Sequence, residues 1–268
     1  MDLSIALRII SLLLLILPTA NLAAAGIDPE VEGCIRKNAP QQSAIQNIKL
    51  ISEGLGYMAE DRVLTAKVYW KHSAEGTSNL LAVFDQPDDI SGSRVLFLER
   101  EGDDEIYLYM PALFKVRRIT SDRISSSMYG MDFSYEDFQW MYNMLSTAVS
   151  EQRPDATING EAMYVVAILP GNVKGSLYES ILAYFDKQSC VIRKVEFYEP
   201  GGKLRKHLLT DTAEIKKVNG ILVPHRFIMR DEKEDSETEL TVVKVEVDPA
   251  INDAMFDPAK LKENRVSD

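Results

Sequence analysis

The sequence lacks the motifs of the common catalytic and cofactor-binding families. It contains no G-x-S-x-G, H-E-x-x-H, G-x-x-x-x-G-K-[ST] or C-x-x-C motif and no EF-hand loop. The three histidines, His72, His207 and His225, have no carboxylate or cysteine at ligand spacing. The acidic groups Asp88-Asp89 and Asp103-Asp104-Glu105 lie in predicted turns, where aspartate bonds to its own backbone. We therefore predict no enzyme, no metal site and no cofactor.

Cysteine is scarce as well. Cys34 and Cys190 are far apart in the sequence, and two thiols without histidine neighbours cannot form a closed zinc site. In an oxidising compartment they could form a disulfide that ties an N-terminal helix to a sheet. Two small buried side chains would fit equally well, and the sequence leaves both alternatives open.

Basic residues are outnumbered: 30 Lys and Arg face 41 Asp and Glu, which gives a net charge of -11. The sequence shows no basic stripe that would suit nucleic acid or anionic lipid headgroups. We therefore expect no nucleic-acid partner.

Long apolar runs are missing too. The run from Ile9 to Leu17 is far shorter than the ~20 residues that ~30 Å of hydrocarbon requires. It follows Arg8 and precedes an alanine triplet that ends at Ala25, which is typical of a cleaved secretory signal peptide. We predict that residues 1–25 are removed after Ala25, that the protein is exported to the periplasm, and that residues 26–268 form a single domain.

The rest of the chain is rich in strand patterns. Apolar residues alternate with period two between glycine, asparagine and aspartate turns, while helices are predicted only over 28–37 and 134–146. The predicted strands are 46–53, 62–70, 79–86, 93–100, 105–110, 114–118, 162–169, 178–186, 190–198, 203–210, 213–218, 221–230 and 238–247. So many strands with so little helix predict a mainly β protein, an antiparallel sheet that curls.

Several of these strands are apolar on both faces, as in Leu80–Phe84 and Val95–Leu98. An antiparallel sheet with one solvated face would instead alternate apolar with polar residues. The sheet must therefore be covered on both faces, or be covered on one face and hold something apolar on the other. A filled core and a lined cavity both satisfy this pattern.

Four blocks of the sequence resemble one protein family. They are GSRVLFLEREGDDEIYLYMPALFKVRR at 92–118, Met131–Asp137 (MDFSYED), Gly220–Pro224 and the late Phe256. Here the chain is similar to the outer-membrane lipoprotein-sorting proteins with a LolA/LolB-like fold. The resemblance implies a half-barrel of about eleven antiparallel strands around a helical plug, with an apolar cavity that receives acyl chains. It also implies a periplasmic binding protein, often linked with transporters of the resistance-nodulation-division type, that is not a catalyst.

The residues expected at such a cavity follow from strand alternation, in which a slip of one residue exchanges the two faces. The classical carrier of this family latches its lid with an arginine, and Arg94, Arg117 and Arg118 lie near the matching blocks here. The predicted wall consists of Leu64, Val68, Trp70, Leu81, Val83, Leu96, Leu98, Ile106, Leu108 and Met110, and the predicted lid of Phe133, Phe138, Trp140 and Met141.

The sequence is compatible with three functions. The first is a soluble carrier that binds lipid or lipoprotein acyl chains for sorting towards the outer membrane, with exchange through movement of residues 120–147. The second is a non-catalytic accessory subunit on an inner-membrane transporter of the resistance-nodulation-division type or on an envelope complex, which a small or dry interior would favour. The third, an envelope hydrolase, would require a carboxylate or histidine pair converging in a cleft. The oligomeric state is left open.

Overall fold

The structure is a computed structural model that describes residues 26–53, 61–73, 76–100, 104–142, 149–171 and 173–263. The predicted signal peptide lies outside these ranges, as do the last residues of the predicted second helix. Neither of the two α-helices within them is long or apolar enough to cross a membrane.

The described chain is dominated by strands. The first half contains α1 (Pro29–Lys37), β1 (Ser43–Ser52), β2 (Arg62–His72), β3 (Ser78–Gln86), β4 (Arg94–Leu98), β5 (Glu105–Met110), β6 (Lys115–Ile119) and α2 (Tyr135–Met141). The second half contains β7 (Val149–Ile158), β8 (Glu161–Leu169), β9 (Ser180–Asp186), β10 (Ile192–Glu199), β11 (Lys203–Thr210), β12 (Ile215–Val218), β13 (Ile221–Pro224), β14 (Arg226–Asp231) and β15 (Ser236–Val247). Short 3-10 turns lie at 111–113, 121–123, 212–214, 253–256 and 258–260.

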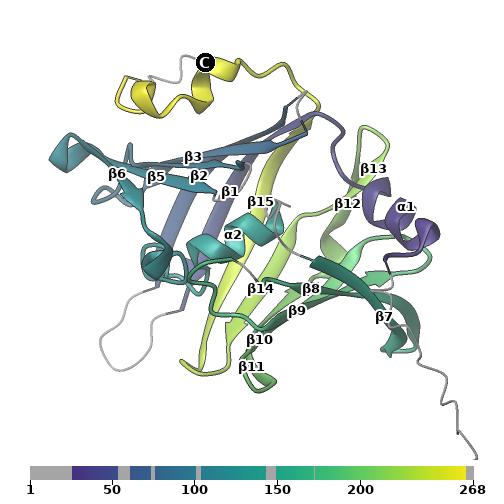
Figure 1. Cartoon of the computed structure of the whole chain (residues 1–268). Coiled ribbons are helices and arrows are strands. Elements are labelled where there is room, and N and C mark those ends of the chain that lie inside the picture. Colours follow the sequence, from purple (N-terminus) through teal and green to yellow (C-terminus); the bar gives the residue numbers. More distant parts are fainter. Residues whose placement is uncertain are drawn as a thin grey trace, which may run out of the picture.

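Thirteen strands form one antiparallel sheet in the order β6-β5-β4-β3-β2-β1-β15-β14-β11-β10-β9-β8-β7. The order consists of two meanders, β1 to β6 and β7 to β15, which join where β1 pairs with β15 from Ala44 to Ser52. Strands β12 and β13 form a separate two-stranded hairpin. The main sheet curls without closing, and α2 lies inside the curl (Figure 1).

The predicted class, a mainly β curled antiparallel half-barrel with a few helices, is confirmed. The main sheet has thirteen strands where the resemblance implied about eleven. Strand β7 was missed because its sequence, VSEQRPDATI, contains a proline and lacks apolar alternation, and the strand lies at the edge of the sheet. The segment predicted as one strand over 221–230 is two strands, since the chain leaves the hairpin at Pro224 and joins the main sheet at Arg226.

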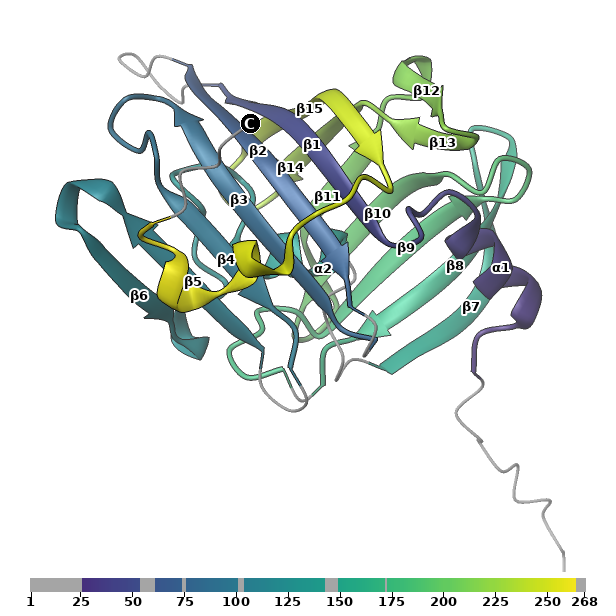
Figure 2. The same cartoon turned by 90° about the horizontal axis from the view of Figure 1, so that it is seen from above.

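Both faces of the first meander are covered. We call the face that α2 covers the concave face and the opposite one the convex face. On β2, the side chains of Leu64, Ala66 and Val68 pack on the concave face, whereas Tyr69 belongs to a second apolar cluster on the convex face. The C-terminal segment, residues 249–263, runs across this convex face (Figure 2). Two covers therefore account for the strands that are apolar on both sides.

Helix α1 forms where the sequence predicts it. The Asp28 carboxylate caps it by accepting from the Glu30 backbone N–H at 2.8 Å, and Pro29 occupies its first turn. Its buried face carries Val31 and Cys34, and Cys34 forms a disulfide with Cys190 in the turn between β9 and β10. The disulfide, one of the two open alternatives, thus ties α1 to the second meander.

This disulfide predicts a measurable contribution to stability. It closes a chain segment of 156 residues, so removing it should lower the free energy of unfolding by about 2–5 kcal/mol, mainly by relaxing the unfolded chain. Chemical denaturation of a Cys34→Ser/Cys190→Ser protein, with and without reductant, measures the difference. The wild-type protein should lose the same amount on reduction, whereas identical curves for all samples would show that no such bond forms.

Candidate functional site

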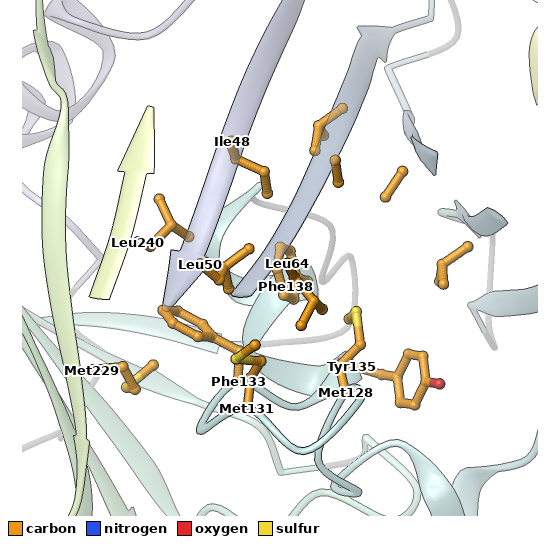
Figure 3. Close-up of a cluster of buried hydrophobic side chains, with 14 of the residues drawn as sticks. Ile48, Leu50, Leu64, Met128, Met131, Phe133, Tyr135, Phe138, Met229 and Leu240 are labelled. Atoms are coloured by element: carbon orange, nitrogen blue, oxygen red, sulfur yellow. The ribbon is translucent and has the colours of Figure 1, made fainter. Parts of the chain in front are cut away.

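The concave face carries an apolar surface to which both meanders contribute. Ile48 and Leu50 of β1 and Leu64 of β2 come from the first meander, and Met229 and Leu240 from the second. All five are almost fully buried. Figure 3 shows these side chains converging on the residues that follow β6. The join between β1 and β15 therefore lies at the centre of one continuous apolar surface.

What covers this surface is the segment between the meanders, residues 120–142, which we call the plug. Its hairpin-like turn is held by the Met128 N–H, which donates to the Phe133 carbonyl at 2.8 Å, and by the Ser127 hydroxyl, which donates to the Met131 carbonyl at 2.6 Å. The turn aims Met128, Met131 and Phe133 at the sheet, and Phe138 of α2 joins them (Figure 3). The plug thus occupies the surface that an apolar ligand would use.

Helix α2 begins at a capping box. Ser134 Oγ accepts from the Asp137 N–H at 3.1 Å, while Asp137 Oδ2 accepts from the Ser134 N–H at 2.7 Å. The same carboxylate accepts from Lys206 Nζ of β11 at 2.8 Å and from the Tyr178 hydroxyl at 2.7 Å. Asp137 is fully buried and Lys206 nearly so. The cap of α2 is therefore also a buried ion pair with the second meander.

A second acidic residue of the plug docks on β15. The Asp132 N–H donates to Thr238 Oγ1 at 3.0 Å, and the Thr238 hydroxyl donates to Asp132 Oδ2 at 2.6 Å. The Ser236 hydroxyl donates to the other carboxylate oxygen. Lys206 Nζ also donates to the Asp132 carbonyl at 2.8 Å. Asp132 and Asp137 are thus linked through Lys206.

A third acidic residue, Glu136, docks on the loop before β9. Its carboxylate accepts from the Ser176 hydroxyl and, at 3.1 Å, from the Leu177 N–H. Within the same loop Gly175 approaches the plug so closely that a Cβ there would lie 1.7 Å from the Ser121 carbonyl oxygen. Burial raises the pKa of Glu136, and the hydrogen bonds from Ser176 and Leu177 lower it by less. The net result is a pKa of about 7. This carboxyl therefore titrates near neutrality.

The plug also contacts the first meander through a polar group, since the Tyr142 hydroxyl donates to Gln46 Oε1 of β1 at 2.6 Å.

Little space is left between the plug and the sheet. Leu50, Leu64 and Phe84 of the sheet and four apolar plug residues line a pocket of about 10 Å³, roughly the room for one water molecule. The concave face is therefore closed in this conformation.

The structure places part of the predicted wall at this surface. Leu64, Val68, Trp70, Ile106 and Leu108 pack on the concave face, and the predicted lid residues Phe133, Phe138, Trp140 and Met141 pack against them. Met110 is half-buried and belongs to neither apolar cluster. Whether these residues bind acyl chains stays a prediction.

The other four predicted wall residues, Leu81, Val83, Leu96 and Leu98, are on the wrong face. They pack on the convex face beneath Ile251, Phe256 and Leu261 of the C-terminal segment. Because successive strand residues alternate faces, the concave positions on these strands belong to their neighbours: Leu80, Ala82, Phe84, Val95 and Phe97. On strands that are apolar on both sides, local residue pattern does not distinguish the two faces.

The cation that holds the plug is Lys206, which sequence reasoning missed. Arg94 instead donates to the Leu261 carbonyl at 2.6 Å on the convex side, and Arg117 and Arg118 belong to the edge strand β6. Lys206 stands between basic and apolar neighbours in KLRKHLLT, so only its inward register on β11 distinguishes it. Within the described ranges no group of three or more His, Cys, Asp or Glu side chains could hold a metal ion.

Comparisons with known proteins agree with this architecture. A family model described as an uncharacterized protein matches residues 76–263. The chain belongs to this family and has the LolA-like fold. A solved domain described as an outer membrane lipoprotein-sorting protein, from Vibrio parahaemolyticus, is 25% identical, with a TM-score of 0.74 over 87% of this chain and 97% of that one. A search of the curated proteins found no significant match.

Two further solved structures share the fold. A DUF1329 family protein from Desulfovibrio piger is 22% identical, with a TM-score of 0.76 over 87% of this chain and 96% of that one. A LolA superfamily protein from Nitrosomonas europaea is 18% identical, with a TM-score of 0.67 over 85% of this chain and 96% of that one. The family resemblance that MDFSYED and its companion blocks indicated is confirmed.

The buried ion pair predicts a large response to loss of one partner. Asp137→Asn or Lys206→Met leaves a buried charge uncompensated, so each should lower the free energy of unfolding by about 3–5 kcal/mol. Denaturant titration measures this, with Lys203→Met, an exposed lysine on the same strand, as the matched control. If Lys206→Met were as mild as Lys203→Met, the ion pair would not hold the plug.

The raised pKa of Glu136 predicts a pH dependence of stability. The folded protein keeps this proton up to about pH 7, while the unfolded chain releases it near 4.5. Raising the pH between these values therefore favours the unfolded state, by on the order of 3 kcal/mol in total. Relative to a Glu136→Gln variant, which can keep both hydrogen bonds, the wild-type protein should lose stability from pH 4.5 to 7.5. Parallel pH profiles would contradict this assignment.

Proposed function

We propose that this protein is an exported carrier that binds lipid or the acyl chains of lipoproteins on its concave face, for sorting towards the outer membrane. The observation that carries the proposal is the pairing of a continuous apolar surface with a plug that docks on it through polar groups. The resemblance in fold to a domain described as lipoprotein-sorting supports it. The proposal includes periplasmic localisation after cleavage at Ala25, and it assigns the protein no catalytic reaction.

The free energies of burying an acyl chain and of exposing the apolar side chains of the plug indicate how the two would exchange. A chain of 16 carbons gains about 12 kcal/mol when it is buried, at ~0.8 kcal/mol per methylene. Moving Met128, Met131, Phe133 and Phe138 fully into water would cost about 6–12 kcal/mol, at ~1.5–3 kcal/mol for each side chain. The cost of exposing these side chains would therefore offset between half and all of the gain from burying the acyl chain. The plug should therefore shift as a lid whose apolar side chains repack on the ligand rather than enter water.

The polar anchors suit this movement. Asp132 binds β15, Glu136 binds the loop before β9, and Asp137 binds Lys206 of β11 as well as that loop, so the docked plug has one defined position. The net contribution of a hydrogen-bonded group is modest because water replaces its partner on release. The anchors would therefore specify the closed arrangement without making it permanent.

A second candidate function is favoured by one observation, the pocket of only about 10 Å³ beneath the plug. A filled interior is what a non-catalytic accessory subunit would need, docked on an inner-membrane transporter of the resistance-nodulation-division type or on an envelope complex. Such a protein would bind no acyl chain at the concave face. Ligand uptake distinguishes the two functions.

The carrier function predicts uptake of a palmitoylated peptide by the purified protein. Binding should be equimolar by native mass spectrometry and should change tryptophan emission, because the two tryptophans, Trp70 and Trp140, both pack at the concave side.

Trp70→Ala should weaken binding of the palmitoylated peptide roughly tenfold through lost apolar contact. Thr238→Val removes one anchor of the plug and should speed uptake several-fold.

The matched control is Val243→Ala, an exposed valine on the same strand as Thr238 that packs on neither cluster. It should bind like the wild-type protein. If neither the wild-type protein nor the Thr238→Val variant took up the peptide, and lipid extraction of the native protein yielded no ligand, the carrier function would be wrong and the accessory function would stand.

A further inference from the structure

The hairpin of β5 and β6 projects from the edge of the sheet and carries exposed apolar side chains at its tip. A 3-10 turn, Pro111–Leu113, joins the two strands and ends at Phe114. Leu113 is 50% exposed and Phe114 77% exposed. In Figure 1 this tip lies at the far left, beyond the body of the sheet. Two adjacent large apolar side chains thus face solvent at the tip of a projecting hairpin.

The backbone at the tip favours this exposure. Phe114 has a φ of 48°, a left-handed conformation that is rare for a bulky aromatic residue. Its N–H donates to the Pro111 carbonyl at 3.0 Å, which closes the turn. The turn holds the aromatic ring away from the concave and convex clusters, since neither cluster includes Phe114.

Basic side chains follow the tip directly. Lys115, Arg117 and Arg118 are exposed on β6, and Arg123 is exposed a few residues further on. Arg118 pairs with Glu105 of β5 at 3.4 Å. The acidic balance of the whole chain hid this group in the sequence, where its members are interrupted by Val116 and Ile119. These exposed basic side chains therefore gather on one hairpin, although the chain as a whole is acidic.

Protection of a sheet edge accounts for only part of the arrangement. Lys and Arg on an edge strand discourage pairing with another chain, and β6 is an edge strand. That role explains the charges but not two exposed apolar residues at the tip. A groove in a protein partner would need a matching concave surface, whereas a fluid bilayer interface accepts a protruding tip without one.

We propose that this hairpin docks on the surface of an anionic phospholipid bilayer. Phe114 and Leu113 would enter the interface between headgroups and acyl chains, and Lys115 and Arg117 would bind lipid phosphates. An apolar tip with basic residues beside it matches a bilayer interface, in which acyl chains lie beneath charged phosphates. Since the chain carries a net charge of -11, the basic hairpin would orient the protein with this edge towards the membrane.

The position of the hairpin gives the docking a consequence that rests on the proposed function. Strand β6 ends at Ile119, and the plug begins at the next residue. Only the five residues of β6, about 17 Å of strand, separate the tip from the plug, so a membrane that holds the hairpin would lie within one short strand of the segment that a carrier would move to load or release an acyl chain. Membrane docking itself does not require that the concave face binds a ligand.

Vesicle sedimentation tests the docking directly. The wild-type protein should bind vesicles of phosphatidylcholine with phosphatidylglycerol, and bind much less to phosphatidylcholine alone. Leu113→Ser/Phe114→Ser should weaken binding to the anionic vesicles by about tenfold or more. Lys115→Gln/Arg117→Gln should weaken it by an order of magnitude as well, and should flatten its salt dependence.

Two matched controls leave the hairpin intact. Lys216→Gln/Lys217→Gln removes two exposed lysines from the separate hairpin of β12 and β13, and Val243→Ser removes an exposed valine from β15 of the main sheet. Both should sediment like the wild-type protein. Binding that is unchanged in the tip variant, or that is equal on the two kinds of vesicle, would overturn the proposal. Uptake of the palmitoylated peptide in vesicle-free solution should be normal in the hairpin variants, so failure of docking and failure of the carrier function are distinguishable.

Discussion

The structure depends on one buried ion pair, Asp137 with Lys206, at the point where the plug meets the second meander. Asp137 is tolerated in an apolar interior because Lys206, Tyr178 and the Ser134 N–H all donate to its carboxylate. Lys206 in turn also binds the Asp132 carbonyl. A buried pair of this kind adds little net stability but strongly disfavours any arrangement that leaves one charge buried without the other. It therefore fixes where the plug sits without locking it there.

This constraint explains the order of the chain. Two antiparallel meanders join through β1 and β15, and the plug between them in sequence lies across that join in space. Its acidic residues reach three elements of the second half of the chain, while Tyr142 reaches β1. The C-terminal segment covers the other face of the first meander. A sheet that is apolar on both sides thus needs two covers, and only the plug combines apolar contacts with a set of buried carboxylates.

Much of this fold was readable from local patterns. The N-cap at Asp28 with Pro29 predicted α1, the capping box predicted the start of α2, and period-two alternation located most strands. Three features were not readable. Strand β7 has no apolar face to pattern, the strands with Leu81 and Leu96 are apolar on both faces, and Lys206 looks in sequence like any lysine on a strand. Each depends on tertiary register, which local sequence does not encode. The motif MDFSYED did mark the site, because three of its residues are the anchors.

The central claim is that the concave face exchanges its plug for an acyl chain. The most direct measurement is amide hydrogen exchange with and without a palmitoylated peptide, followed at Asp132 and Leu177, whose N–H groups donate across the boundary of the plug to Thr238 Oγ1 and to the Glu136 carboxylate. Binding should lower the protection of these two amides while the ladder between β1 and β15 keeps its protection. Protection of Asp132 and Leu177 that stays the same or rises when the peptide is bound would contradict the exchange.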